Sequence, residues 1–285
     1  MMRRLDVRMT TAQRVSRPIS ETDGGPVEAV RPPLKWAGGK RWQVQHLVGY
    51  WQRHTTSRLV EPFCGGLAVT LGLMPQQALL NDINPHVVNF YRWLKRGLVI
   101  TLPMGNVETR FYTHRKRFNK LLRDGQGETA EAASLFYYLN RTGYNGLCRF
   151  NGSGEFNVPF GKYATINYRN DFLEFKSVFA EWNFTNTDFD QIPLRADDFV
   201  YSDPPYDVEF TAYSKGGFGW DAQVRTAEWL AKHNGPVVLS NQATKRIVDL
   251  YSSLGYNLTF LKAPRRISCT GDRTPAPEVL AVRNL

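Results

Sequence analysis

A carboxylate, two prolines and an aromatic ring follow one another at the end of an apolar, strand-like run. The run is Phe199–Ser202, and the residues after it are Asp203, Pro204, Pro205 and Tyr206. Proline fixes φ and has no backbone N–H, so the Pro204 carbonyl can face a ligand without competition from a donor of its own. A carboxylate and a carbonyl match the two donors of an exocyclic amine, and the aromatic ring offers a stacking face. The segment suits a planar amine such as a nucleobase, and the alternative is an Asp-Pro turn with a half-buried tyrosine.

Two earlier segments could bind a nucleotide-like cofactor. Residues 61–66, Glu-Pro-Phe-Cys-Gly-Gly, follow a short apolar strand, and paired glycines there allow the backbone to approach a ligand closely. Taken alone, this segment is equally well explained as a tight turn. Asp82 ends the next strand, at the distance where nucleotide-binding α/β folds place a ribose-binding carboxylate. The alternative is that Asn81 and Asp82 cap the helix that begins near Pro85.

Two further sites have residue types that suit a nucleoside. Asp188 follows another strand-like run and could accept from the adenine amine of a cofactor, or it could cap a turn near Asp190. The segment 34–40 has Lys35 and Lys40 around a glycine turn beside Trp36. That mixture fits a loop touching a nucleoside and a phosphate, and the alternative is solvated lysines with a core tryptophan.

A basic segment, 111–123, interleaves cations with aromatic residues at helical spacing. Phe111, Phe118 and Leu122 can face a core while the cations face outward. Such a face is either simply solvated or contacts phosphates. The formal net charge of +10 favours a polyanionic partner.

The elements that would position these residues alternate between strands and helices. Short apolar runs at 59–60, 78–80, 199–201 and 236–240 are each followed by a plausible helix, the pattern of a parallel α/β sheet. Two late runs, 258–261 and 279–282, predict a terminal antiparallel hairpin.

The pattern breaks between about 85 and 170. Helical signals dominate at 85–96, 106–123 and 129–140, and a Gly/Asn-rich segment follows at 142–161. This arrangement predicts a mainly helical insertion between the two halves of the sheet.

The composition excludes several classes of protein. The 285 residues include three cysteines without a CxxC pair, so neither a disulfide framework nor a zinc ribbon is indicated. No run approaches the ~18 apolar residues of a membrane helix. Residues 1–31 lack periodicity and predict a mobile extension, with a DNA-touching arm as the alternative. No apolar stretch follows Arg3 and Arg4, so a secretory signal is not expected.

Taken in order, six segments resemble the DNA adenine-N6 methyltransferases of the Dam type, the α class of amino-methyltransferases. They are LKWAGGK at 34–40, EPFCGG at 61–66, LNRTGYNGLCRFN at 139–151, GEFNVPFG at 154–161, SDPPY at 202–206 and FTAY at 210–213. The resemblance runs from about Leu34 to the C-terminus. The sequence departs from the family pattern in two places. The segment 267–277 lacks the glycine- and lysine-rich composition expected there, and the N-terminal extension is unusual for the family.

The resemblance implies a doubly wound, mainly parallel sheet, the class I S-adenosylmethionine-dependent methyltransferase core. Residues 32–84 and 171–285 would form this core, and 85–170 a mainly helical target-recognition insertion. It implies S-adenosylmethionine as cofactor, S-adenosylhomocysteine as product and no metal. The implied catalytic residues are Asp203, Pro204 and Tyr206. The implied cofactor-site residues are Trp36, Lys40, Phe63, Cys64, Gly65, Asp82, Asp188 and Asp203.

The resemblance also implies a way of reading DNA. A hairpin from Tyr144 to Asn151 would enter the duplex, with Tyr144 stacking where the flipped target base had been. The implied DNA-binding residues are Lys35, Tyr144, Asn145, Leu147, Arg149, Asn151 and Pro159. Arginine is the commonest donor pair to guanine, and an apolar side chain can meet a thymine methyl group. The implied target is the adenine of GATC.

The expected setting follows from the same resemblance. The partner would be double-stranded DNA, with no membrane, and the protein would be a cytoplasmic monomer encoded by a bacterium, a phage or another mobile element. A cognate restriction endonuclease acting separately is a further expectation. The alternatives are methylation of RNA adenine or of cytosine N4, and a DNA-binding regulator that has lost catalysis. Cytosine-N4 enzymes more often have serine where Asp203 stands here.

Overall fold

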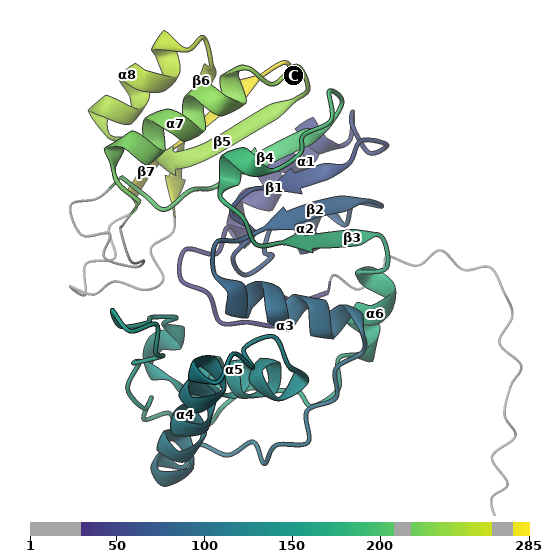
Figure 1. The fold of residues 1–285 in the computed structure, drawn as a ribbon. Helices are drawn as coiled ribbons and strands as arrows, with labels where there is room; N and C mark the ends of the chain where they lie inside the picture. Colours follow the sequence, from purple (N-terminus) through teal and green to yellow (C-terminus); the bar gives the residue numbers. More distant parts are fainter. Residues whose placement is uncertain (1–29, 208–217, 264–275) are drawn as a thin grey trace, which may run out of the picture.

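A twisted seven-stranded sheet forms the centre of the molecule, in the order β3-β2-β1-β4-β5-β7-β6 (Figure 1). The computed structural model describes residues 30–207, 218–263 and 276–285. The strands are β1 Leu59–Glu61, β2 Ala78–Asn81, β3 Trp182–Thr185, β4 Phe199–Ser202, β5 Val237–Gln242, β6 Asn257–Ala263 and β7 Ala276–Arg283. The first five in this order are parallel, whereas β7 is antiparallel to both β5 and β6. The predicted parallel sheet and terminal hairpin are both confirmed.

Helices cover both faces of the sheet because successive strand residues face opposite sides. Leu59, Phe199 and Tyr201 belong to one buried core, and Val60 and Val200 to the other. The first core also contains residues of α1 (Val44–Trp51), α2 (Thr70–Leu73), α3 (Pro85–Lys95) and α6 (Leu173–Val178). The second contains residues of α7 (Trp220–Ala231) and α8 (Lys245–Ser253). This is the doubly wound α/β fold that the sequence predicts.

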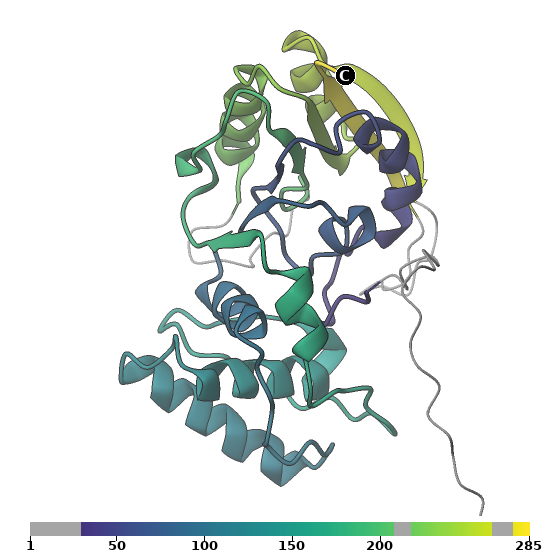
Figure 2. The same cartoon turned by 90° about the vertical axis from the view of Figure 1, so that its right-hand side faces the viewer.

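A helical layer lies below α3 in Figures 1 and 2, away from the sheet. It consists of α4 (Glu108–Arg123) and α5 (Ala130–Thr142), and α5 packs against both α3 and α4. The predicted helices at 85–96, 106–123 and 129–140 are therefore confirmed. Helix α3 also packs against α6 and β3, so it connects the helical layer to the sheet.

The strand order determines which loops meet. Strand β1 lies between β2 and β4, and β2 pairs with β3, all parallel. Loops after neighbouring parallel strands meet at one edge, and ligands of such folds bind where the order reverses. That reversal lies between β1 and β4, so segment 61–66, Asp82, Asp188 and Asp203 are brought to the same edge.

Some predictions fall outside the described residues. These are the N-terminal extension up to residue 29, the segment 210–213 and most of the segment 267–277. Within the described ranges, no helix is long and apolar enough to cross a membrane.

Candidate active site

A cavity of about 670 Å³ opens at the carboxyl edge of the parallel strands. All eight residues predicted for the cofactor line it: Trp36, Lys40, Phe63, Cys64, Gly65, Asp82, Asp188 and Asp203. Pro204, Tyr206 and Leu147 line the same cavity. Segments from six separate parts of the chain thus line one cavity.

The paired glycines after β1 allow Trp36 to pack on the backbone. Gly65 has φ +43°, and a Cβ there would lie 2.5 Å from Trp36 Nε1. A Cβ on Gly66 would lie 2.7 Å from the Cβ of Trp36. Side chains at either position would displace the indole, so the tryptophan and the turn form one wall of the cavity.

Asp82 holds the turn that contains Gly65. Its carboxylate accepts from the Gly65 N–H at 3.0 Å and the Asn84 N–H at 2.8 Å. The cap of α3 is Asn84, whose side chain accepts from the His86 N–H at 3.0 Å, so the capping interpretation of Asn81 and Asp82 is wrong. Burial raises the pKa of Asp82 to about 6, and the two backbone hydrogen bonds oppose this shift.

Asp188 has a capping function and also lines the cavity. It caps the short 3₁₀ helix η3 (Phe189–Gln191) and accepts from the Phe189 N–H at 2.8 Å. Arg225 Nη2 donates to both carboxylate oxygens, at 2.7 and 2.6 Å. The carboxylate is therefore fixed in direction, and Arg225 is a lining residue that the sequence analysis missed.

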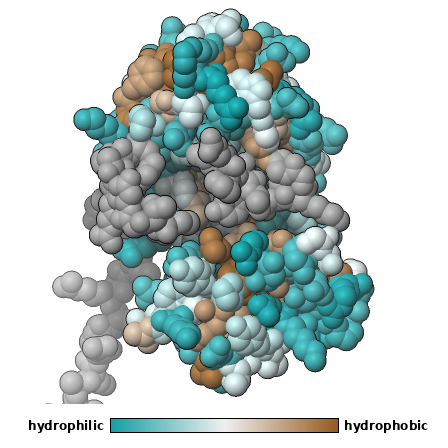
Figure 3. Space-filling view, turned by 90° about the vertical axis from the view of Figure 1, so that its left-hand side faces the viewer, coloured by the Kyte–Doolittle hydropathy of each residue, from teal (hydrophilic) through white to brown (hydrophobic). Residues whose placement is uncertain are grey.

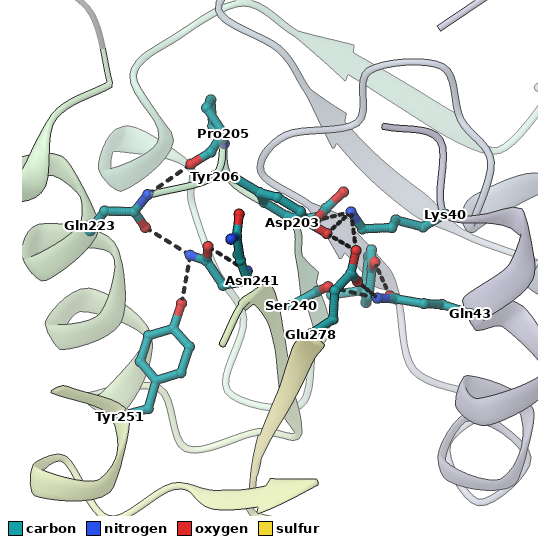
Figure 4. A network of polar contacts seen from close by, with 12 residues as sticks. Lys40, Gln43, Asp203, Pro205, Tyr206, Gln223, Ser240, Asn241, Tyr251 and Glu278 are labelled. Atoms are coloured by element: carbon teal, nitrogen blue, oxygen red, sulfur yellow. Dashed lines mark hydrogen bonds and ion pairs between the residues drawn. The ribbon is translucent and has the colours of Figure 1, made fainter. Parts of the chain in front are cut away.

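Asp203 begins the loop after β4 and is paired with a lysine (Figure 4). Lys40 Nζ lies 3.2 Å from Asp203 Oδ1, and the aspartate side chain remains 20% exposed. Burial raises the pKa of Asp203 to about 6; Lys40 lowers it and the carboxylate of Glu278 raises it. Next in the loop, the Pro205 carbonyl accepts from Gln223 Nε2 at 2.7 Å.

Tyr206 is held at its hydroxyl by two buried groups. Lys40 Nζ donates to this hydroxyl, and the hydroxyl donates to Glu278 Oε1. Glu278 Oε2 accepts in turn from Gln43 Nε2 at 2.6 Å. Sequence reasoning missed Glu278, Gln43 and Gln223. A glutamate directly before the apolar run 279–282 of β7 was the available signal, because an isolated charge is rarely buried without partners.

The predicted DNA-reading segment borders the cavity. Tyr144 is 51% exposed, its N–H donates to the Pro159 carbonyl at 2.9 Å, and Asn145 has φ +52°. Phe150 forms an antiparallel bridge with Phe156, so residues 149–157 make a short hairpin. The hairpin expected from Tyr144 to Asn151 therefore has other bounds: residues 144–146 form the short 3₁₀ helix η2, and the hairpin spans 149–157.

Two more of the side chains predicted to bind DNA, Asn151 and Arg149, have partners within the hairpin. Asn151 Oδ1 accepts from the N–H groups of Ser153 and Glu155, which shapes the turn. Arg149 Nε donates to Asn157 Oδ1 at 2.8 Å while the arginine remains exposed. The hairpin is thus ordered before it meets any partner.

Lys35 lies where segment 34–40 meets the 143–161 region. Its Nζ donates to the Arg141 carbonyl at 3.1 Å and lies 3.9 Å from the centre of the Tyr163 ring. Burial lowers the pKa of Lys35. A Cβ on Gly146, which has φ +64°, would lie 2.6 Å from the Cβ of Lys35, so the two segments are in close contact.

Helix α4 is amphipathic, as predicted, and three of its six lysine and arginine side chains form ion pairs. Phe111 and Phe118 are buried, whereas Leu121 rather than Leu122 enters the core fully. Ion pairs join Arg117 to Glu131, Lys120 to Asp124 and Arg123 to Glu155. The outer surface of the helical layer is mostly hydrophilic with small hydrophobic patches (Figure 3). Of the two interpretations, a solvated face therefore accounts better for these three cations.

Comparison with known proteins agrees with this geometry. Residues 36–267 match the family described as D12 class N6 adenine-specific DNA methyltransferase. The chain is 35% identical to the retron Ec67 DNA adenine methylase of Escherichia coli over 87% of this chain and 90% of that protein. It is 37% identical to the DNA adenine methylase of Vibrio cholerae over 87% of this chain and 94% of that protein. The chain belongs to the D12 class of N6 adenine-specific DNA methyltransferases.

Proposed function

We propose that this protein methylates N6 of an adenine flipped out of duplex DNA, within the sequence GATC. The observation that supports this most is the shared cavity, because Asp203, Pro204 and Tyr206 line it together with the segments predicted to hold the cofactor. The family match favours DNA adenine over the alternatives of RNA adenine or cytosine N4.

Membership of the family implies S-adenosylmethionine as the methyl donor, and the cavity fits such a group. Asp82 would accept from ribose hydroxyls and Asp188 from the adenine amine, with Trp36 and Phe63-Cys64-Gly65 forming the walls. Both carboxylates are fixed by hydrogen bonds from the protein, which suits directional acceptors. When bound, the cofactor supplies a methyl group on sulfonium that is already a strong electrophile.

The chemical task of the protein is to prepare the amine. The N6 lone pair of adenine is delocalised into the ring. Asp203 and the Pro204 carbonyl would accept the two amine hydrogens, which draws the nitrogen toward tetrahedral geometry and localises the lone pair. They also stabilise the positive charge that develops on nitrogen. Tyr206 would stack the base so that N6 lies in line with the methyl group, a proximity effect.

The distribution of exposure around Asp203 supports this role. Oδ1 is buried beside Lys40, yet the side chain as a whole is 20% exposed, so the rest of the carboxylate reaches the cavity. Lys40 thus occupies one oxygen and leaves the other for the amine. A proton released after transfer can pass to this carboxylate and then to solvent.

The insertion, residues 85–170, would position the DNA. Tyr144 is an exposed ring close in sequence to Gly146 and Leu147, which line the cavity, and it can replace the stacking lost when a base flips, which costs a few kcal/mol. Asn145 and Asn151 would flank it. Arg149 would release its hydrogen bond to Asn157 and donate to a guanine instead. Leu147 and Pro159 would contact apolar groups such as a thymine methyl, and Lys35 would contact the first guanine of the site. The enzyme would act in the cytoplasm on chromosomal or mobile-element DNA.

Replacing Asp203 tests the catalytic assignment. Asp203→Ala should lower turnover by orders of magnitude while DNA affinity stays nearly intact. Asp197→Asn is the matched control, because Asp197 is exposed and lies before β4, at the opposite end of the same strand. Normal turnover in Asp203→Ala would contradict the proposed mechanism.

A further inference from the structure

A buried glutamate on β7 connects the catalytic loop to the core. Glu278 is only 4% exposed, on a strand whose other residues are apolar except for Arg283 at its end. Oε1 accepts from the Tyr206 hydroxyl, and Oε2 accepts from Gln43 Nε2 at 2.6 Å. A carboxylate buried in this way is costly unless its oxygens are satisfied, and both are. The glutamate is therefore held in one orientation.

Gln43 makes that orientation rigid. It is fully buried, its Oε1 accepts from the Tyr201 hydroxyl at 2.8 Å, and its Nε2 donates also to Ser240 Oγ at 2.8 Å. Tyr201 and Ser240 belong to the neighbouring central strands β4 and β5. Figure 4 shows Gln43, Ser240 and Glu278 converging below Asp203 and Tyr206. The position of Glu278 is thus determined by the sheet itself.

Lys40 lies between two carboxylates. Its Nζ is 3.2 Å from Asp203 Oδ1 and 3.7 Å from Glu278 Oε1. It also lies 4.0 Å from the centre of the Tyr206 ring. One ammonium between two carboxylates leaves a net charge of about −1 when all three groups are ionised. That charge favours a cationic transition state in a site of low dielectric.

We propose that Glu278 is a positioning residue for methyl transfer: it fixes the Tyr206 ring through its hydroxyl and holds Lys40 against one oxygen of Asp203. The ring then stacks the base in one orientation, and the second oxygen of Asp203 is left for the amine. This assignment rests on the proposed function, since it needs a base in the cavity. Glu278 touches neither base nor cofactor in this account and acts through its two neighbours.

The pH dependence of turnover separates this role from a merely structural one. Among the residues that the structure describes, the charged and titratable groups around Asp203 are Lys40, Glu278, Glu61, Tyr201, Tyr206 and Tyr251. Burial raises the pKa of Glu61 to about 8 and raises those of the three tyrosines, so these groups are largely neutral at pH 7. Glu278 is then the main negative neighbour of Asp203. Removing its charge should lower the pKa of Asp203, and removing Lys40 should raise it.

The test compares Glu278→Gln with wild type in single-turnover methyl transfer to duplex DNA. We expect the rate to fall about 10- to 100-fold, the scale of a hydrogen bond to a charged group. The dissociation constants for cofactor and DNA should change less than about threefold, and the acidic limb of the pH profile should move to lower pH. Glu181→Gln is the charge-matched control, because Glu181 is exposed and adjoins the amino end of β3.

A second variant keeps the test decisive if Glu278→Gln lowers the melting temperature too far for the assay. Tyr206→Phe removes only the hydroxyl that Glu278 holds, and it should slow transfer by a similar factor. The double variant should then be slowed by less than the product of the two effects, because both changes act on the same contact between Tyr206 and Glu278. Full activity with an unmoved pH profile in Glu278→Gln, or full activity in Tyr206→Phe, would overturn this assignment alone. Absence of methyl transfer by the wild type would overturn the proposed function, and this assignment with it.

Discussion

Asp203→Asn should make the protein more stable while it removes turnover. The pKa of Asp203 is raised from 3.8 to about 6 in the folded protein, chiefly by burial. A raised pKa means that the folded state resists ionisation, so stability is fully present below pH 3.8 and declines as the pH rises through 6. Asparagine is neutral at every pH and avoids this decline.

The size of the effect follows from the same shift. A difference of about 2 in pKa corresponds to about 3 kcal/mol above pH 7, and to roughly half of that near pH 5. For a protein of this length, each kcal/mol raises the melting temperature by roughly 2–4 °C. We therefore expect Asp203→Asn to melt roughly 6–12 °C higher at pH 8, with a difference that nearly vanishes at pH 4.

Thermal melting of both proteins from pH 4 to 8 measures this directly. Asp197→Asn serves as the control, because its carboxylate is exposed and its substitution should leave the melting curve unchanged at every pH. An Asp203→Asn variant that melts at or below the wild-type temperature at pH 8 would refute the reasoning. It would mean that the Lys40 ion pair outweighs the desolvation of the carboxylate.

Three further substitutions test the cofactor cavity, the buried core and the DNA-binding role of Tyr144. Gly65→Ala should weaken cofactor binding at least about tenfold in calorimetry, because the new Cβ would lie 2.5 Å from Trp36 Nε1 and the residue has φ +43°. Arg58→Ala should lower the free energy of unfolding in urea by about 3–5 kcal/mol, since it leaves Asp198, which is 0% exposed, without its two-point ion pair. Tyr144→Ala should reduce the fluorescence of 2-aminopurine at the target position in the DNA complex, because base–aromatic stacking contributes about 1–3 kcal/mol.

Matched controls accompany these changes. Gly49→Ala adds a Cβ in open space on α1 and should bind cofactor as wild type does. Arg53→Ala and Tyr112→Ala remove exposed side chains and should leave unfolding and base flipping unchanged. Unchanged cofactor affinity in Gly65→Ala, a stability loss below about 1 kcal/mol in Arg58→Ala, or full fluorescence in Tyr144→Ala would each contradict the corresponding assignment.

Most of the sheet and its cavity could be predicted because the relevant signals are local. Strands β1, β2 and β4 are short apolar runs followed directly by site residues, as Asp82 follows β2 and Asp203 follows β4. Parallel strands with connecting helices bring such ends to one edge whatever the length of the loops. The long segment between β2 and β3 therefore did not obscure the rest of the fold.

The missed contacts all depend on pairing between distant segments. Glu278 meets Tyr206 only because β7 inserts antiparallel next to β5, and Arg225 meets Asp188 through the packing of α7. The capping interpretation of Asn81 and Asp82 failed because Asn84, directly before Pro85, is the residue that caps α3. One of the two N–H groups that bind Asp82, that of Gly65, lies in the neighbouring β1 loop, and the local sequence does not reveal this contact.

The central claim is methylation of adenine N6 within GATC, and the most direct test is transfer of labelled methyl from S-adenosylmethionine to two duplexes. The duplexes differ only in containing GATC or GTAC. We predict label on adenine N6 of the GATC duplex alone. Label on both would contradict the assignments of Lys35, Leu147, Arg149 and Pro159 as readers. Label on neither, with cofactor bound, would contradict the proposed substrate.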